Sequence, residues 1–245
     1  MTTTLPIETP NLSEQLRCPK GKAGKELGQT MYDSNKNMIK EAICALKTVK
    51  KNRVLEIGPG NGKHLGEILG KGPDVRYFGL DISETMIEEA ERINKEFIEG
   101  RKALFELYDG KSIPFVHNFF HRILTVNTIY FWDAPELFLT ELYRVLQPGG
   151  IVVIAFVDAN TMHGLPFVDD SFELYDISKI AKLVSNSQFS NIDIQTKAER
   201  VQSKDEQTVD RQYLVITLQK KKGILEKERD IVLKKSLKKM KCHGH

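Results

Sequence analysis

Apolar residues follow two patterns along the chain, and each pattern predicts a different kind of element. Between residues 25 and 49 they recur at spacings of three, four and seven, which is the period of a helix with one buried face. Short apolar runs predict buried strands, and they lie at residues 54–57, 75–80, 103–107, 122–126 and 151–157. Helical segments lie between these runs. Strands that alternate with helices predict a parallel sheet with helices on both faces.

The last part of the chain breaks this alternation. A helix capped by Asp176 is predicted to run to about residue 185, and strands are predicted at 192–196 and 213–218. The residues between these strands, 197–211, are polar and predict a long hairpin loop without a helix. The sheet is therefore expected to end in an antiparallel hairpin at one edge.

A glycine-rich loop follows the first predicted strand, with the sequence Glu56-Ile57-Gly58-Pro59-Gly60-Asn61-Gly62. Glycine removes the side chain where a backbone turns sharply or meets a ligand, and ligands of parallel sheets bind at this carboxyl edge. The third glycine of a dinucleotide fingerprint would fall at Lys63, and a P-loop would need Ser or Thr at His64. Neither pattern fits, which leaves another ligand or a plain strand-to-helix turn.

Two acidic residues favour a ligand over a plain turn. Glu56 ends an apolar strand, where a carboxylate is unfavourable in a core but suits a cationic ligand such as an amino-acid-bearing sulfonium. Asp81 ends the second strand, where an acid accepts hydrogen bonds from both hydroxyls of a ribose. Ser83 fills the N-cap role for the next helix, with the backbone of Met86 as its target, so Asp81 is not needed as the cap.

Four stretches resemble the motifs of class I methyltransferases and occur in the family's order over residues 54–157. The run from Val54 to Gly62 resembles the first motif, and Gly79-Leu80-Asp81-Ile82-Ser83 resembles the motif of the second strand. The other two are Asp109-Gly110-Lys111-Ser112-Ile113-Pro114-Phe115, similar to D-A-x-x-L-P-F, and Leu146-Gln147-Pro148-Gly149-Gly150, similar to L-K-P-G-G. Within the family the chain most resembles ubiquinone and menaquinone C-methylases and many small-molecule methyltransferases.

This resemblance implies a Rossmann-like α/β fold with a seven-stranded, mostly parallel sheet in the order 3-2-1-4-5-7-6, the last strand being antiparallel. It also implies S-adenosylmethionine as the cofactor, with its ribose on Asp81, its adenine beside Ile82 and Asp109, and its methionine moiety near Asn127. The complete predicted cofactor site is Glu56, Gly58, Pro59, Gly60, Asn61, Gly62, Asp81, Ile82, Met86, Asp109, Gly110 and Asn127.

Two positions depart from the family pattern. His121 stands where an Asp is common before the fourth strand, so we expect the hydrogen bond of that Asp to be lost. Gly110 replaces a common Ala, which we expect to change little. Residues before 53 and after 158 match only loosely, and in this family those regions usually select the methyl acceptor.

Four residues are candidates for the acceptor side of the site. Tyr130 and Trp132 belong to an aromatic cluster after the fourth strand, which either stacks a planar acceptor or cation or packs beneath the next helix. Tyr32 either closes over the cofactor or packs in the core. His163, after the fifth strand, is either a general base or a solvated loop histidine. No catalytic residue is assigned, because direct methyl displacement depends on orientation and a base is optional.

The composition is that of a soluble globular protein, with 245 residues of which 40% are hydrophobic and 28% charged. We expect an irregular segment at 1–24, a cofactor-binding methyltransferase domain with an N-terminal cap helix at 25–220, and a basic helical tail at 221–245. The net charge is +3, but residues 220–245 carry +7, so the rest of the chain carries about −4. The tail therefore suits contact with an acidic partner or a membrane surface.

Scattered cysteines and the lack of a signal peptide or long apolar run predict a cytoplasmic protein. We expect no metal site, since Cys242, His243 and His245 have no element to fix them. The predicted function is methyl transfer from S-adenosylmethionine to a small-molecule acceptor by direct displacement. The alternatives are an RNA or protein methyltransferase that docks through the basic tail, although nothing makes a strong case for nucleic acid, and a non-catalytic module that binds the cofactor.

Overall fold

Seven strands make one sheet in the computed structural model, which describes residues 12–202 and 208–222. The strands are β1 (Arg53–Ile57), β2 (Arg76–Asp81), β3 (Ala103–Leu107), β4 (Phe120–Val126), β5 (Leu146–Val157), β6 (Ser190–Gln202) and β7 (Thr208–Gln219). Their order is β3-β2-β1-β4-β5-β7-β6, and β7 runs antiparallel to both of its neighbours while the other pairs are parallel. The predicted fold class and strand order are confirmed.

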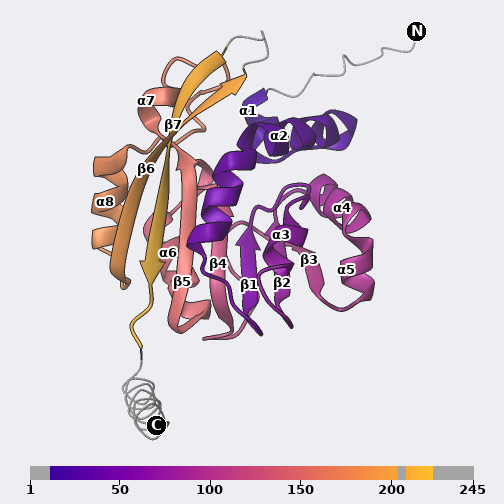
Figure 1. Cartoon of the computed structure of the whole chain (residues 1–245). Coiled ribbons are helices and arrows are strands. Elements are labelled where there is room, and N and C mark those ends of the chain that lie inside the picture. The colour runs from indigo at the N-terminus through magenta and orange to yellow at the C-terminus, as the bar shows by residue number, and fades with distance from the viewer. Residues whose placement is uncertain (1–11, 203–207, 223–245) are drawn as a thin grey trace, which may run out of the picture.

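Helices cover the sheet on both faces. They are α1 (Leu12–Arg17), α2 (Gly21–Ala45), α3 (Leu65–Leu69), α4 (Glu84–Ile93), α5 (Lys95–Glu99), α6 (Pro135–Val145), α7 (Ala159–Met162) and α8 (Ile177–Ser185), with a 3-10 turn η1 (Ile129–Phe131). The lower half of α2 lies in front of the sheet against β4 and β5, and α6 lies behind it (Figure 1). None of the helices in the described ranges has the length and apolar character needed to cross a membrane.

The central strands are buried from both faces, as their apolar runs predict. Val54 and Leu55 of β1 and Val152 and Val153 of β5 have no exposed surface. Parallel strands covered by helices on both sides read as continuous apolar runs because neither face meets water. Because β1, β2 and β4 are parallel, their carboxyl ends meet at one edge of the sheet. Helix α1 and the upper half of α2 lie above this edge (Figure 1).

The N-terminal segment is more ordered than the sequence predicts. Residues 12–17 form α1, and α2 begins at Gly21 instead of residue 25. The side chain of Gln15 accepts a hydrogen bond from the backbone N–H of Lys20 at 2.9 Å. A Cβ on Gly24 would lie 2.7 Å from the carbonyl carbon of Pro19, so only glycine permits this approach. The expectation of an irregular segment is therefore wrong for the residues of α1 and the start of α2. The contacts that order them join particular residues and leave no periodic pattern in the sequence.

The late hairpin is also longer than expected. Strands β6 and β7 continue pairing to Gln202 and Thr208, through most of the stretch predicted as a loop. Polar residues there face each other across the strands, and Arg211 binds Glu199 and also the side chain of Asn35 on α2. Charged cross-strand pairs stabilise such a ribbon without apolar residues, which is why hydrophobicity did not reveal it. The predicted tail at 221–245 lies almost wholly outside the described residues, which end at 222.

One predicted helix, from residue 83 to 98, is divided by Asn94 into α4 and α5. The Asn94 amide is buried and donates to the carbonyl oxygen of Gly62 at 3.1 Å and to that of Ala90 at 2.9 Å. The break in the helix therefore ties it to the glycine-rich loop.

His121 makes a hydrogen bond to the neighbouring strand at the position where we expected one to be lost. Its Nδ1 accepts from the backbone N–H of Arg53 at 3.0 Å, at the start of β1. Burial lowers the pKa of His121, and the charges of Arg53 and Arg122 lower it further. The neutral imidazole, which has a free acceptor nitrogen, is the form that the fold favours.

The variant His121→Asp should therefore change how stability depends on pH. In the wild type the unfolded chain binds a proton near the ordinary histidine pKa of 6.5 and the folded chain binds it at lower pH, so this contribution is present above pH 6.5 and lost below it. Urea unfolding at about pH 7.5 and 5.5 should show a smaller loss for His121→Asp than for wild type. His121→Leu should cost about 1 kcal/mol at pH 7.5 and less at pH 5.5, because leucine does not titrate and wild type has lost part of its own stability there. Equal losses in wild type and His121→Asp would contradict this assignment.

Candidate cofactor and acceptor site

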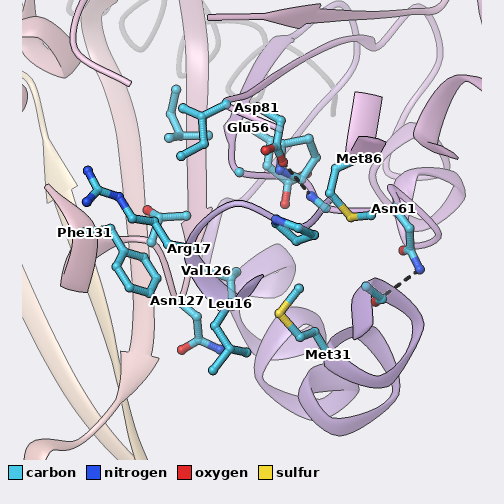
Figure 2. Close-up of a pocket in the computed structure, with 18 of the residues that line it drawn as sticks. Leu16, Arg17, Met31, Glu56, Asn61, Asp81, Met86, Val126, Asn127 and Phe131 are labelled. Carbon is cyan, nitrogen blue, oxygen red and sulfur yellow. Dashed lines mark hydrogen bonds between the residues drawn. The ribbon is translucent and has the colours of Figure 1, made fainter. Parts of the chain in front are cut away.

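A pocket opens at the carboxyl edge of the sheet, between the glycine-rich loop and helices α1 and α2 (Figure 2). Most of the predicted site residues line it. From the predicted cofactor set these are Glu56, Gly58, Pro59, Gly60, Asn61, Asp81, Ile82, Met86, Gly110 and Asn127, and from the acceptor set Tyr32 and Trp132. The structure thus brings together residues from β1, β2 and the ends of β3 and β4.

The glycine-rich loop has the left-handed backbone that glycine permits. Gly58, Gly60 and Gly62 have φ values of 69°, 56° and 62°. A Cβ on Gly58 would lie 2.5 Å from Cγ2 of Thr128, whereas a Cβ on Gly60 would meet no atom within 4 Å. Gly58 therefore allows the loops after β1 and β4 to pack together. Gly60 leaves open space in the pocket.

Asp81 lies at the end of β2 and is only 6% exposed. One carboxylate oxygen accepts from the backbone N–H of Ser83 at 3.0 Å and the other from that of Gly60 at 3.1 Å. Burial raises the pKa of Asp81 to about 6, against the opposing effect of these hydrogen bonds. The carboxylate both fixes the glycine-rich loop and faces the pocket with capacity for further donors.

The start of α4 connects this loop to the N-terminal segment. The Ser83 hydroxyl accepts from the backbone N–H of Met86 at 3.1 Å, as predicted for an N-cap, and donates to the carbonyl oxygen of Pro19. The hydroxyl of Thr85 accepts from the backbone N–H of Gly21 at 3.0 Å. These bonds hold α1 and α2 over the pocket.

Glu56 is already paired within the chain, which changes its predicted role. Its carboxylate is 1% exposed and accepts a hydrogen bond from the Tyr77 hydroxyl at 2.6 Å. The Nε2 atom of His64 lies 2.9 Å from one of its oxygens and 2.8 Å from the other. Glu56 is therefore not a free carboxylate available to a cationic ligand, and no sequence pattern indicated that His64 and Tyr77 would pair with it.

Four predicted residues lie outside the pocket lining. Gly62 turns toward Asn94 and Phe105, and the exposed Asp109 accepts from the backbone N–H groups of Lys111 and Ser112, both at 2.7 Å. The other two are Tyr130, whose hydroxyl is buried and accepts from the backbone N–H of Val157 at 2.7 Å, and His163, which is exposed after α7. Hydrogen bonds within the chain hold Gly62, Asp109 and Tyr130 in place, whereas His163 is an exposed loop residue.

Several lining residues were not predicted. They are Leu16, Arg17, Pro19, Gly28, Met31, Asn35, Ile39, Ile57, His64, Tyr108, Val126, Thr128 and Phe131. Many come from α1, α2 and the residues between these helices. In Figure 2 Leu16, Met31 and Phe131 lie on the side of the pocket that faces away from Asp81.

The loop after β4 has a constrained backbone. Asn127 has a φ of 56°, a left-handed conformation that asparagine tolerates better than most residues. Its Oδ1 accepts from the Tyr130 hydroxyl at 3.0 Å and from the backbone N–H of Val157 at 3.3 Å. Trp132 Nε1 donates to Thr128 Oγ1 at 3.1 Å. The aromatic cluster is thus divided: Tyr130 supports β5, while Phe131 and Trp132 line the pocket.

Comparison with known proteins agrees with this geometry. Residues 55–154 match the model of a family described as a methyltransferase domain. The methyltransferase YdaC of Bacillus subtilis is 26% identical over 128 residues, which are 52% of this chain and 68% of that protein. A fatty-acid O-methyltransferase of Mycolicibacterium smegmatis is 30% identical over 129 residues, which are 51% of this chain and 43% of that protein.

A solved S-adenosylmethionine-dependent methyltransferase from Thermotoga maritima has the same fold, with a TM-score of 0.57, 20% identity, and coverage of 79% of this chain and 94% of that one. The fold is that of class I S-adenosylmethionine-dependent methyltransferases, and residues 55–154 carry the match to a methyltransferase domain. Two features fit the family's cofactor: the backbone at Gly60 is open to a ligand, and the Asp81 carboxylate faces the same pocket. In the described part of the chain, no three His, Cys, Asp or Glu side chains gather as a metal site would require.

Replacing Gly60 with alanine should separate folding from cofactor binding in this methyltransferase. The left-handed backbone should cost about 1–2 kcal/mol of stability, and the added methyl group should project into the pocket and weaken S-adenosylhomocysteine binding more than about tenfold. Gly21→Ala is the matched control, because Gly21 has a similar φ of 62° and open space but does not line the pocket. Calorimetry should find near-wild-type affinity for the control, and similar losses in both variants would refute the placement of Gly60.

Proposed function

We propose that this methyltransferase transfers a methyl group from S-adenosylmethionine to a small-molecule acceptor with an apolar surface, by direct displacement. The observation that carries the proposal is the pocket itself, in which Leu16, Met31 and Phe131 lie on the side away from Asp81 (Figure 2). Apolar side chains that line the pocket include Leu16, Met31, Ile39, Val126, Phe131 and Trp132.

The side that carries Asp81 would hold the cofactor. Asp81 would accept hydrogen bonds from the ribose hydroxyls, Gly60 would leave room for the backbone to approach, and Ile82 and Gly110 would flank the adenine. When bound, S-adenosylmethionine supplies a methyl group on a positively charged sulfur that leaves as a neutral thioether. The task of the chain is then to align the acceptor with that methyl group and to exclude water, which can contribute roughly 7–11 kcal/mol through orientation alone.

The helices above the pocket favour a small acceptor. A hydrogen bond from Ser83 to Pro19 and one from Gly21 to Thr85 hold α1 and α2 over the carboxyl edge, so an acceptor must fit beneath them. The relative that methylates fatty acids, by its name, also acts on an acceptor with a large apolar part. Arg17 lines the pocket at its exposed rim, paired with Asp133 at 3.3 Å, and would suit the polar end of such a molecule.

Substitution of Asp81 tests the proposal that this carboxylate binds the ribose of the cofactor. Asp81→Ala should weaken S-adenosylhomocysteine binding at least about tenfold, because two hydrogen bonds to a charged acceptor are lost. Wild-type affinity should also fall about tenfold per pH unit below pH 6, where the carboxyl group takes up a proton, since ribose hydroxyls donate best to the ionised form. Calorimetry between pH 5 and 8 measures both, with Asp109→Ala as the control. A pH-independent wild-type affinity would contradict the ribose role.

Removal of residues 223–245 tests the proposal that the methyl acceptor is a small molecule. A small-molecule enzyme should retain its turnover, because the described lining of the pocket lies between residues 16 and 132, whereas an RNA or protein methyltransferase that docks through the tail should lose it. The assay is labelled-methyl transfer into fractionated cell extract, with full-length and shortened protein side by side. Label in macromolecules only from the full-length protein would overturn the small-molecule proposal, and binding of the cofactor without any transfer would favour a non-catalytic module.

A further inference from the structure

Three polar side chains form a buried cluster beneath the pocket: Glu56, His64 and Tyr77. They are exposed by only 1%, 3% and 1%. Glu56 lies at the end of β1, Tyr77 near the start of β2, and His64 at the N-terminus of α3, directly after the glycine-rich loop. Tyr77 and His64 together satisfy both carboxylate oxygens of Glu56.

The contact with Glu56 determines which nitrogen of His64 carries a proton. Because Nε2 lies between the two carboxylate oxygens, it must donate to them. Burial alone would lower the pKa of His64, but the charge and hydrogen bond of Glu56 outweigh burial and raise it. Glu67 also raises it, while Tyr77 and the parallel ring of Tyr32 are uncharged neighbours. The fold therefore favours an imidazolium, in which Nδ1 carries a proton as well.

Nδ1 of His64 has no hydrogen-bond partner and no contact with solvent. A buried donor without an acceptor costs roughly 1–3 kcal/mol, so such groups in native proteins call for an explanation. His64 also lines the pocket. A ligand in the pocket is thus the natural source of the missing acceptor.

We propose that Nδ1 of His64 donates a hydrogen bond to the carboxylate of the methionine moiety of the bound cofactor. This inference rests on the proposed function, in which S-adenosylmethionine occupies this pocket. The carboxylate is the anionic group of that molecule, and hydrogen bonds between a cation and an anion are about twice as strong as neutral ones.

The charge of the site supports this assignment. Glu56 and Asp81 both line the pocket, and their carboxylates would repel that of the cofactor. His64 neutralises Glu56 and offers its second N–H in the same ring. Glu56 is then a positioning residue, which sets the protonation and orientation of His64, and His64 is the group that touches the cofactor.

Two substitutions separate the two nitrogens of His64. In His64→Gln the amide nitrogen can take the place of Nε2 and keep Glu56 paired, but the donor at Nδ1 is lost. In His64→Asn the amide nitrogen takes the place of Nδ1 and keeps the donor. The ligands are S-adenosylhomocysteine and its decarboxylated analogue, which retains the ammonium group but lacks the carboxylate, each titrated by calorimetry into the full-length protein.

His64→Gln should weaken S-adenosylhomocysteine binding by roughly tenfold or more and change the affinity for the decarboxylated analogue by less than about twofold. His64→Asn should recover most of the lost affinity. Equal weakening of both ligands by His64→Gln, or no weakening of either, would overturn the role of His64. Failure of wild-type protein to bind either ligand would instead overturn the proposed function, so the two failures are distinguishable.

A measurement on wild-type protein keeps the proposal testable if both variants unfold. Protein labelled with ¹⁵N-histidine should show one imidazole that is protonated on both nitrogens near neutral pH. Its Nδ1–H signal should shift when S-adenosylhomocysteine is added and stay in place with the decarboxylated analogue. The same shift with both ligands, or a Nδ1 without a proton, would contradict the proposal.

Discussion

A carboxylate buried at the end of the central strand constrains the whole site. Glu56 is 1% exposed, and an unpaired charge in such a place would be prohibitively costly. Its partners come from the start of α3 and from β2, so the pairing fixes the strand, the helix and the loop between them relative to one another. The glycine-rich loop is held by two of these elements at its ends and by Asp81 at its middle, which prepares it for a ligand before one arrives.

The other wall of the pocket comes from a segment outside the part of the chain that matches the family model. Helices α1 and α2 are attached to the cofactor loop and to α4 by hydrogen bonds from Asn61, Ser83 and Gly21. Gly28 has no side chain, which lets α2 approach Met86. A Cβ at this position would lie only 2.8 Å from the sulfur of Met86. The pocket is therefore lined both by the part of the chain that matches the family model and by the N-terminal helices, and it is complete only when these helices pack.

The loop after β4 serves the sheet and the pocket at the same time. Thr128 packs on Gly58 and accepts a hydrogen bond from Trp132, so the indole is held beside the glycine-rich loop. Asn127 takes the left-handed backbone that redirects the chain, and its side chain binds to Tyr130 and β5. Adjacent aromatic residues thus have different tasks, because the tight turn η1 points them in different directions.

The sequence by itself determined the strands, the fold class, the glycine-rich loop, the Ser83 cap and the place of Asp81. These follow from short-range rules, since apolar runs, turn residues and caps act over a few positions. Only the tertiary structure decided that Glu56 is paired, that His121 replaces an acid as acceptor, that Asp109 lies outside the pocket and that residues 12–24 cover it. Most of these depend on partners far along the chain, such as His121 and Arg53, 68 residues apart, whereas Asp109 is held by its near neighbours Lys111 and Ser112. Whether a buried polar group is paired depends on how the whole fold packs, and a local sequence pattern does not show this.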